Sequence, residues 1–492
     1  MKISSYVLTV IYIQIYMTFK ILSATFLQDG KHSFTLDFTQ PESNSQDCEF
    51  TLLIGKNGVG KSLIQEAIID FLLYVWVSYT MYSMVRRSKY IFCTTLIYYM
   101  NGAVCKLDWQ EGSLHFYIDG EECSVLLDYL PRIVATSFSI CDKFKVPGSK
   151  ERELFHFYKY IGAKVNGNMI SPTSILFTLL SNIASASQEQ LNRINNAINA
   201  IGYELYISFR FKLQAVNEKF TFNETLNDFE MKAKETTYAG KKFRQLKFNE
   251  KQVLFDFYEK IKGNKDAISM NIDLTDGNDL DAKKHDVYAL YKLRQMHVIN
   301  LSQISFRKVS KEFVSCIDMS SGEFNMLATI ISVASVAEKN VLVLMDEPEI
   351  SQHPSWQMSI IDYLDKCLKG QACHLLIATH SNFLVSSLPM KRSEVLHLYK
   401  DEHNLIKSKE IENNTYGWSA EEVLLKVFNM PTTRNRYLAS IVGELMNGIS
   451  YDTMKEEEVL SKISFLKEIV GNLNDIDPMK KIIETIIETF EE

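Results

Sequence analysis

The chain has 492 residues, of which 46% are hydrophobic and 23% charged, and its formal net charge is −7 at pH 7. This length allows two or three domains with a large buried core, and the composition excludes a disordered or fibrous chain. The mildly acidic total also excludes a globally basic nucleic-acid or membrane binder, so any nucleic-acid contact must come from a local basic patch.

The cysteines and the apolar runs indicate in which compartment the protein is expected and whether it crosses a membrane. The eight cysteines are scattered without CxxC pairs or Cys/His clusters, which excludes a zinc site or a disulfide scaffold and predicts a cytoplasmic protein. The apolar run Val7–Met17 is interpreted as a buried strand, an extension upstream of a natural start at Met17, or a signal peptide. Ile68–Val77 contains Asp70 and is predicted to lie in a buried helix, so no membrane association is expected.

Residues 1–174 are predicted to form the N-terminal lobe of an α/β domain. Short β-type runs separated by turns predict strands, and these runs are Lys20–Leu27, His32–Phe38, Phe50–Ile54, Lys89–Tyr99, Ala103–Trp109, Leu114–Ile118 and Arg132–Ser139. A long apolar helix is predicted after the third of these strands, beginning near Leu63.

A phosphate-binding loop joins that third strand to the helix. The residues that fit the pattern GxxxxGK[ST] are Gly55, Lys56, Asn57, Gly58, Val59, Gly60, Lys61 and Ser62. Glycines let backbone N–H groups surround a phosphate, and the helix dipole favours its charge. Lys61 is expected to bridge the β- and γ-phosphates of ATP, and the Ser62 hydroxyl to ligate Mg²⁺.

Residues 175–298 are predicted to form a mainly helical insertion. Amphipathic helices are expected over Ser185–Ala200, Glu218–Lys234 and Lys247–Lys262. A basic and aromatic run between the last two predicts a nucleic-acid contact or, alternatively, a solvated helical face. Its central cations are Lys241, Lys242 and Arg244, interleaved with Tyr238, Phe243 and Phe248.

Residues 299–392 return to strand–helix alternation and form the predicted C-terminal lobe. The run Val341–Met345 leads into Asp346 and Glu347, which predicts a buried parallel strand with two carboxylates at the ligand-binding edge of the sheet. Asp346 is expected to reach the Mg²⁺ shell and Glu347 to polarise the attacking water.

Two further motifs flank this strand. Ser320, Ser321 and Gly322 precede Glu323 and an apolar helix over Phe324–Val336, which predicts an open helix N-terminus able to bind the γ-phosphate of another protomer's nucleotide.

The strand His374–Ala378 ends at His380, which stands 33 residues after Glu347 and is predicted to contact the γ-phosphate. Residues 393–492 hold the strand-like run Val395–Tyr399 and are otherwise predicted to be mostly helical.

This order of motifs resembles that of ABC-type ATPases, and in particular the SMC-like branch that includes the RecF and OLD ATPases. That resemblance rests on the sequences of Asp346–Pro354 and Ala378–Ser381. It implies an ABC-type ATPase head with a mixed or parallel sheet, and a dimer or higher oligomer that encloses ATP. Lys61, Ser62, Asp346, Glu347 and His380 would then act within one protomer and Ser320–Gly322 across the interface, while Pro348–His353 would join the two active sites. The Mg²⁺-sensing glutamine of the family has no secure counterpart, and Thr136–Ser139 is similar to that segment.

Three segments, Phe138–Phe144, Tyr158–Gly162 and Trp418–Arg434, resemble ATPase subunits of Septu- and PARIS-type antiphage systems. That resemblance implies an ATPase that senses infection and controls a separate nuclease effector. No Toprim or HNH nuclease motif is recognised in this chain. One alternative is a RecF-like repair ATPase that binds DNA directly. Another is the cytoplasmic ATPase subunit of a transporter, which the signature sequence and the long insertion disfavour.

Overall fold

The fold comes from a computed structural model, which describes residues 19–38, 47–80, 90–139, 142–146, 157–162, 164–165, 169–170, 172–214, 222–225, 228–231, 242–264, 266–336, 339–411, 415–428, 430, 435–451, 453–473 and 477–491. The apolar run Val7–Met17 and Lys241 therefore lie outside the described residues. Within the described part, no helix is long and apolar enough to cross a membrane.

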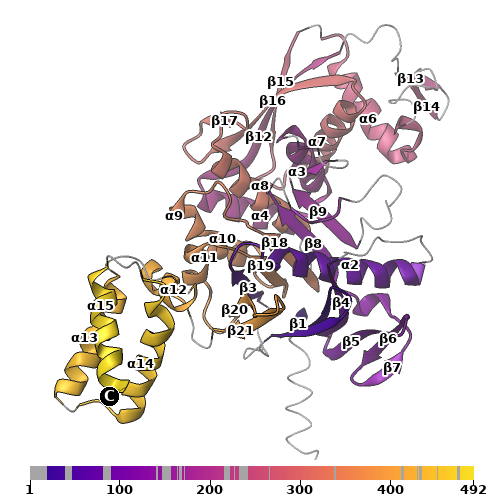
Figure 1. The fold of residues 1–492 in the computed structure, drawn as a ribbon. Coiled ribbons are helices and arrows are strands. Elements are labelled where there is room, and N and C mark those ends of the chain that lie inside the picture. The colour runs from indigo at the N-terminus through magenta and orange to yellow at the C-terminus, as the bar shows by residue number, and fades with distance from the viewer. Residues whose placement is uncertain are drawn as a thin grey trace, which may run out of the picture.

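A mainly parallel sheet forms the centre of the molecule (Figure 1). Among the described residues its strands follow the order β21 (Ile406–Glu410), β20 (Ser393–Lys400), β3 (Glu49–Gly55), β19 (His374–Ala378), β18 (Val341–Asp346), β8 (Arg132–Ser137) and β9 (Tyr158–Gly162). All neighbouring pairs are parallel except β20 and β21. Every residue of β3, β18 and β19 is buried, and the sequences of β18 and β19 are accordingly rich in aliphatic residues.

An antiparallel sheet covers one face of the central sheet. Its order is β2 (His32–Asp37), β1 (Phe19–Gln28), β4 (Ile91–Met100), β5 (Ala103–Gln110), β6 (Ser113–Ile118) and β7 (Glu121–Cys123), followed by the short helix η1 (Leu127–Tyr129). Helix α2 (Lys61–Thr80) shares a hydrophobic core with this sheet, and Leu53, Leu342 and Leu344 of the central sheet point into it.

The opposite face of the central sheet is covered by helices and by a third sheet. A second hydrophobic core lies on this face. Leu52, Val343 and Met345 point into it, because successive residues of a strand point to opposite faces of the sheet. The helices in the described part of this region are α3 (Pro172–Ser185), α4 (Gln188–Ala200), α6 (Phe248–Ile261), α7 (Leu280–Gln295), α8 (Ser321–Val336), α9 (Pro354–Gln357), α10 (Ile360–Cys367) and α11 (Asn382–Ser386). The third sheet has the order β15 (Ile268–Asp273), β12 (Tyr203–Leu213), β16 (Ile299–Lys308) and β17 (Phe313–Ser315).

The C-terminal helices form a separate small core beside the body of the protein, coloured yellow in Figure 1. They are α12 (Ala420–Lys426), α13 (Arg436–Ser450), α14 (Glu456–Val470) and α15 (Pro478–Glu491). Two hairpins complete the described elements: β10 (Lys164–Val165) with β11 (Met169–Ile170), and β13 (Phe222–Thr225) with β14 (Asp228–Met231).

The structure confirms most of the predicted elements and corrects one. Strands and helices occur at the predicted places in both lobes, and α4 and α6 occur as predicted in the segment 175–298. The predicted helix Glu218–Lys234 is wrong, because its described residues form the β13–β14 hairpin with Phe222 opposite Met231. The segment 175–298 also contains β12 and β15, which pair with each other, so strands accompany its helices.

A buried polar network ties the two lobes together at the amino ends of the central strands. His374 Nδ1 accepts a hydrogen bond from the backbone N–H of Ile21 at 3.2 Å, and its Nε2 lies 2.9 Å from Thr51 Oγ1. The Thr51 hydroxyl donates to Glu394 at 2.6 Å, and Lys20 Nζ lies 3.6 Å from the same carboxylate. Burial, together with the charge of Lys20, lowers the pKa of His374 well below its usual value, so this side chain is neutral.

Candidate active site

The phosphate loop lies between β3 and α2, as its spacing predicts, and its packing explains two of its glycines. A side chain at Gly55 would come within 2.3 Å of the backbone oxygen of Leu398, and one at Gly60 within 2.8 Å of the Ile406 side chain. Both glycines also have positive φ, at 148° and 116°. The loop therefore depends on glycine because the β20–β21 hairpin packs directly against it.

Lys61 lies at the start of α2 and contacts both lobes. Its ammonium donates to the Gly55 backbone oxygen at 3.1 Å and lies 2.6 Å from His380 Nε2. Burial lowers the pKa of Lys61 to about 8, against the opposing pull of the Glu347 and Asp346 carboxylates. His380 Nε2 is in turn 3.8 Å from Glu347 Oε1, so Lys61, His380 and Glu347 form one cluster.

The His380 imidazole is held in its neutral form in this cluster. Burial and then the Lys61 charge lower the pKa of His380, while Glu347 raises it. Because the Lys61 ammonium can only donate, the nearby Nε2 must act as the acceptor.

A second contact joins the phosphate loop to the end of β18. Ser62 Oγ donates to Asp346 Oδ1 at 2.8 Å. Asp346 is only 4% exposed, and burial, with the neighbouring Glu347 and Asp142 carboxylates, raises its pKa to about 6. The hydroxyl and the buried carboxylate are oxygen ligands of the kind that Mg²⁺ prefers, and a divalent cation would stabilise the ionised form of Asp346.

The described residues contain no cluster of three or more His, Cys, Asp or Glu that could hold a metal ion by themselves. Nucleotide-bound Mg²⁺ commonly takes one or two protein oxygens and completes its shell with phosphate oxygens and water. Ser62 and Asp346 therefore fit a magnesium ion that arrives with ATP.

The loop after β18 is held in an unusual backbone conformation by Glu349. Glu347 and Ser351 have positive φ, at 50° and 61°. The buried Glu349 carboxylate accepts hydrogen bonds from Thr379 Oγ1 at 2.7 Å and from the His380 backbone N–H at 2.8 Å. Glu349 thereby fixes the backbone that carries His380 relative to the loop that carries Glu347. Sequence reasoning placed Glu349 within Pro348–His353, the stretch that would join the two active sites, but gave its side chain no role of its own.

The signature residues lie at the N-terminus of α8 and contact a different part of the same loop. Ser320 Oγ accepts from the Glu323 N–H at 3.2 Å, and the Glu323 carboxylate accepts from the Ser320 backbone N–H at 3.1 Å, which is a reciprocal N-terminal cap. A side chain at Gly322 would come within 2.7 Å of the Ser351 backbone oxygen. Gly322 thus packs on the loop after Glu347, whereas Lys61, Ser62, Asp346, Glu347 and His380 contact one another.

A comparison with known protein families identifies the family of this chain. The AAA ATPase domain family matches residues 115–385, which is more than half of the chain. The chain belongs to the AAA ATPase domain family. The match covers β8, α8, β18 and β19 but begins after the phosphate loop, so the place of that loop in this ATPase is given by its contacts with Asp346 and His380.

Two curated relatives are similar to parts of this ATPase. The Septu protein PtuA of Bacillus thuringiensis is 26% identical over 194 residues, which is 38% of this chain and 47% of that protein. Protein ea59 of Escherichia phage lambda is 28% identical over 136 residues, which is 28% of this chain and 25% of that protein. The chain therefore spans about half the length of the first relative and a quarter of the second.

Among solved structures, the SMC head domain of Thermotoga maritima is similar with a TM-score of 0.37 and 11% identity, covering 80% of this chain and all of that one. The Smc head domain of Pyrococcus furiosus with an extended coiled coil, bound to the C-terminal domain of ScpA, has a TM-score of 0.33 and 12% identity over 80% of this chain and 96% of that one.

The structure revises the basic run that was predicted to contact nucleic acid. Lys242 is half-buried and Arg244 exposed, and Lys241 lies outside the described residues. Phe243 is only 4% exposed and packs in the core, with Lys251 over its ring, so it cannot stack on a base. The interleaved aromatic pattern is therefore wrong for Phe243, while Phe248 is 52% exposed.

The segment expected to sense Mg²⁺ lies beside Asp346. Ser137 at the end of β8 is the register partner of Asp346 in the sheet, and its hydroxyl accepts from the Ser139 N–H at 3.2 Å. Asp142 follows, bonded to Tyr160 and paired with Lys164 at 2.8 Å. Asp142 was not predicted as a site residue because no local sequence pattern marks it. Its relevance follows from the structure, where its charge helps to raise the pKa of Asp346.

Proposed function

We propose that ATP and Mg²⁺ bind at Gly55–Ser62, and that two protomers close around the nucleotide through Ser320–Gly322. The observation that carries this proposal is the pair of contacts from the phosphate loop to the C-terminal lobe, Ser62 with Asp346 and Lys61 with His380. Residues separated by about three hundred positions in the chain lie within hydrogen-bonding distance at the carboxyl edge of the sheet. That edge is where open α/β sheets bind their ligands.

The chemistry follows from the charges at this edge. The Lys61 ammonium and the cation held by Ser62 and Asp346 would neutralise the β- and γ-phosphates. Glu347 is partly exposed beside His380 and would accept the hydrogen of the attacking water, while His380 would orient toward the γ-phosphate once Lys61 turns to the nucleotide.

The catalytic assignment is tested by Glu347→Gln. Removal of a catalytic base typically lowers turnover by about 10² to 10⁴-fold, so ATP hydrolysis should fall at least about a hundredfold while ATP binding and the closed dimer persist. Glu402→Gln, at an exposed turn, is the matched control and should hydrolyse ATP at the wild-type rate. Wild-type turnover by the Glu347 variant would reject this residue as the base.

We further infer that the ATPase cycle controls a separate nuclease effector in antiphage defence. The partial similarity to the Septu protein PtuA supports this role, as does the resemblance of three segments to Septu- and PARIS-type ATPase subunits. Native mass spectrometry of the chain, co-expressed with its flanking genes and with ATP, would detect such a partner. A nucleotide-dependent homodimer without a second polypeptide would favour the alternative, a RecF-like ATPase that acts on DNA directly.

A further inference from the structure

Asp142 is a buried carboxylate close to the proposed magnesium ligand Asp346. The residue is only 4% exposed. It follows β8, whose last residue Ser137 pairs with Asp346 in the sheet, and its charge reaches Asp346, where it contributes to the raised pKa of that carboxyl group. Two negative charges this near each other are costly in a buried site that holds no cation, because like charges repel. An ion of charge +2 at Ser62 and Asp346 would make the charge of Asp142 favourable instead.

Three hydrogen-bond donors of the protein hold the Asp142 carboxylate in place. Its Oδ1 accepts from the Phe144 N–H at 3.0 Å and from Lys164 Nζ at 2.8 Å, and its Oδ2 accepts from the Tyr160 hydroxyl at 2.8 Å. Burial and the charge of Asp142 raise the pKa of Tyr160, so this hydroxyl keeps its proton and donates. An ionised carboxylate offers about four acceptor positions, so about one position on Asp142 remains for a further donor such as water.

Lys164 is the counter-charge that allows Asp142 to stay ionised inside the protein. The Lys164 side chain is 12% exposed, and its ammonium also contacts the Asp142 backbone oxygen. Lys164 lies on β10, whereas Asp142 lies in the loop after β8, so the ion pair joins two segments of the chain. Burying an unpaired charge is strongly unfavourable. The pair therefore keeps a negative charge beside Asp346 at a lower cost than a lone carboxylate would.

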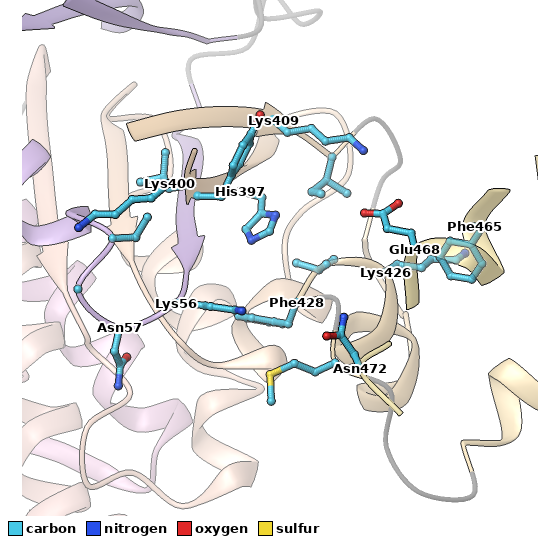
Figure 2. A pocket seen from close by; sticks show the side chains of 17 residues that line it. Lys56, Asn57, His397, Lys400, Lys409, Lys426, Phe428, Phe465, Glu468 and Asn472 are labelled. Carbon is cyan, nitrogen blue, oxygen red and sulfur yellow. The ribbon is translucent and has the colours of Figure 1, made fainter. Parts of the chain in front are cut away.

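The open space beside the phosphate loop does not reach this ion pair. A cleft of about 970 Å³ is lined by residues 56–59 of the loop and by side chains of β20, α12 and α14. In Figure 2, Lys56 and Asn57 of the loop border this cleft. Asp142, Lys164 and Asp346 do not line it. The charge of Asp142 therefore acts on a cation at Asp346 through the protein interior, where electrostatic interactions are stronger than in water.

We propose that Asp142, with its charge adjusted by Lys164, is a positioning residue that makes nucleotide binding at the phosphate loop depend on Mg²⁺. Nucleotide-bound Mg²⁺ keeps several water molecules, and the remaining acceptor position of Asp142 suits one of them. Groups just outside the ligands of a metal orient those ligands and strengthen metal binding. In the absence of the ion, the same charge repels the phosphates of ATP. The proposal rests on the binding of ATP and Mg²⁺ at Gly55–Ser62 proposed above.

The test measures nucleotide affinity with and without the metal. A fluorescent, non-hydrolysable ATP analogue is titrated in excess Mg²⁺ and again in EDTA, and the ratio of the Kd in EDTA to the Kd in Mg²⁺ reports the dependence on the metal. Asp142→Asn should lower this ratio by about 10- to 100-fold, the range typical of groups just outside the ligands of a metal. It should do so by weakening binding in Mg²⁺ and tightening it in EDTA. Lys164→Gln should raise the ratio, because it leaves the charge of Asp142 uncompensated.

Asp70→Asn is the matched control. Asp70 is also buried and pairs with Lys145 at 3.4 Å, but it stands about two turns of α2 beyond Ser62. Its replacement should therefore leave the ratio unchanged. A purely structural role for Asp142 and Lys164 predicts that both of their variants weaken binding in Mg²⁺ and in EDTA alike.

Two results would overturn the proposal: shifts of the ratio in the same direction for Asp142→Asn and Lys164→Gln, or a shift in Asp142→Asn no larger than that in Asp70→Asn. Failure of the proposed function gives a different result, which is visible in the wild type. Equal affinity of the wild type for the analogue in Mg²⁺ and in EDTA would refute the metal site at Ser62 and Asp346, and this proposal with it.

Discussion

Helix α8 packs closely against the loop after Glu347. We therefore predict that Gly322→Ala destabilises the protein, although the same replacement stabilises most helices. In an ordinary helical position, replacing glycine with alanine stabilises a protein by about 0.4–1 kcal/mol, because the unfolded chain loses conformational freedom. At Gly322 the added methyl would come within 2.7 Å of the Ser351 backbone oxygen and 3.4 Å of the Gln352 Cα. A backbone atom cannot move aside as a flexible side chain can.

The expected magnitude follows from these distances. Overpacking a well-packed site typically costs about 1–3 kcal/mol. Gly322→Ala should therefore lower the free energy of unfolding by about 1–3 kcal/mol. Gly443→Ala, in the interior of α13 with no heavy atom within 4 Å of the new methyl, is the matched control and should raise it by about 0.4–1 kcal/mol.

Urea denaturation of both variants beside the wild type measures these changes, and ATP turnover provides a second readout. The displaced loop also carries Glu347, so Gly322→Ala should lower turnover, whereas Gly443→Ala should leave it unchanged. If Gly322→Ala stabilised the protein as much as Gly443→Ala does, the close packing of α8 on the loop at Ser351 would be refuted.

The remaining predictions concern three buried polar groups. Because the pKa of Lys61 is about 8, its side chain loses its positive charge above that pH. ATP affinity should therefore fall between pH 8 and 9.5 by up to about tenfold per pH unit, as calorimetric titration can measure. Lys61→Arg should abolish this pH dependence. Glu349→Ala leaves the Thr379 hydroxyl and the His380 N–H without their acceptor, which should cost about 1–3 kcal/mol of stability and lower kcat; Glu349→Gln retains an acceptor and should restore most of both. The pKa of His374 is lowered in the folded protein, so its neutral form stabilises the fold fully above the unfolded-state pKa of about 6.5. Below that pH the free energy of unfolding should fall by up to about 1.4 kcal/mol per pH unit. Urea denaturation between pH 7.5 and 5 should show this loss in the wild type relative to His374→Gln.

Each of these has a result that would contradict it. ATP affinity that stays constant up to pH 9.5 would mean that Lys61 is not buried as described. Equal kcat in Glu349→Ala and the wild type would remove Glu349 as a positioning residue for His380. Parallel stability curves for the wild type and His374→Gln would show that His374 can take up a proton in the folded state.

Sequence patterns predicted the local elements well where one physical requirement dominated. The β3–loop–α2 unit could be recognised because glycines, a lysine and a serine at fixed spacing serve phosphate binding, and the flanking strand and helix are strongly apolar. The strand β18 was equally clear, because a run such as Val341–Met345 is typical of a fully buried parallel strand. The pattern failed at Glu218–Lys234, where short alternations of polar and apolar residues suit both a helix face and a hairpin.

Pairings between distant segments were decided by the tertiary structure alone. The amino-acid sequence by itself determined the chemical groups of the site: the loop lysine and serine, the two carboxylates after β18, and the histidine after β19. It did not determine that Leu398 closes over Gly55, that Ser351 meets Gly322, or that Glu349 bonds the His380 backbone. Local patterns report which face of an element is apolar, but the neighbour that covers it depends on the order of strands in the sheet. That order is set by burial summed over the whole core, which no short segment encodes.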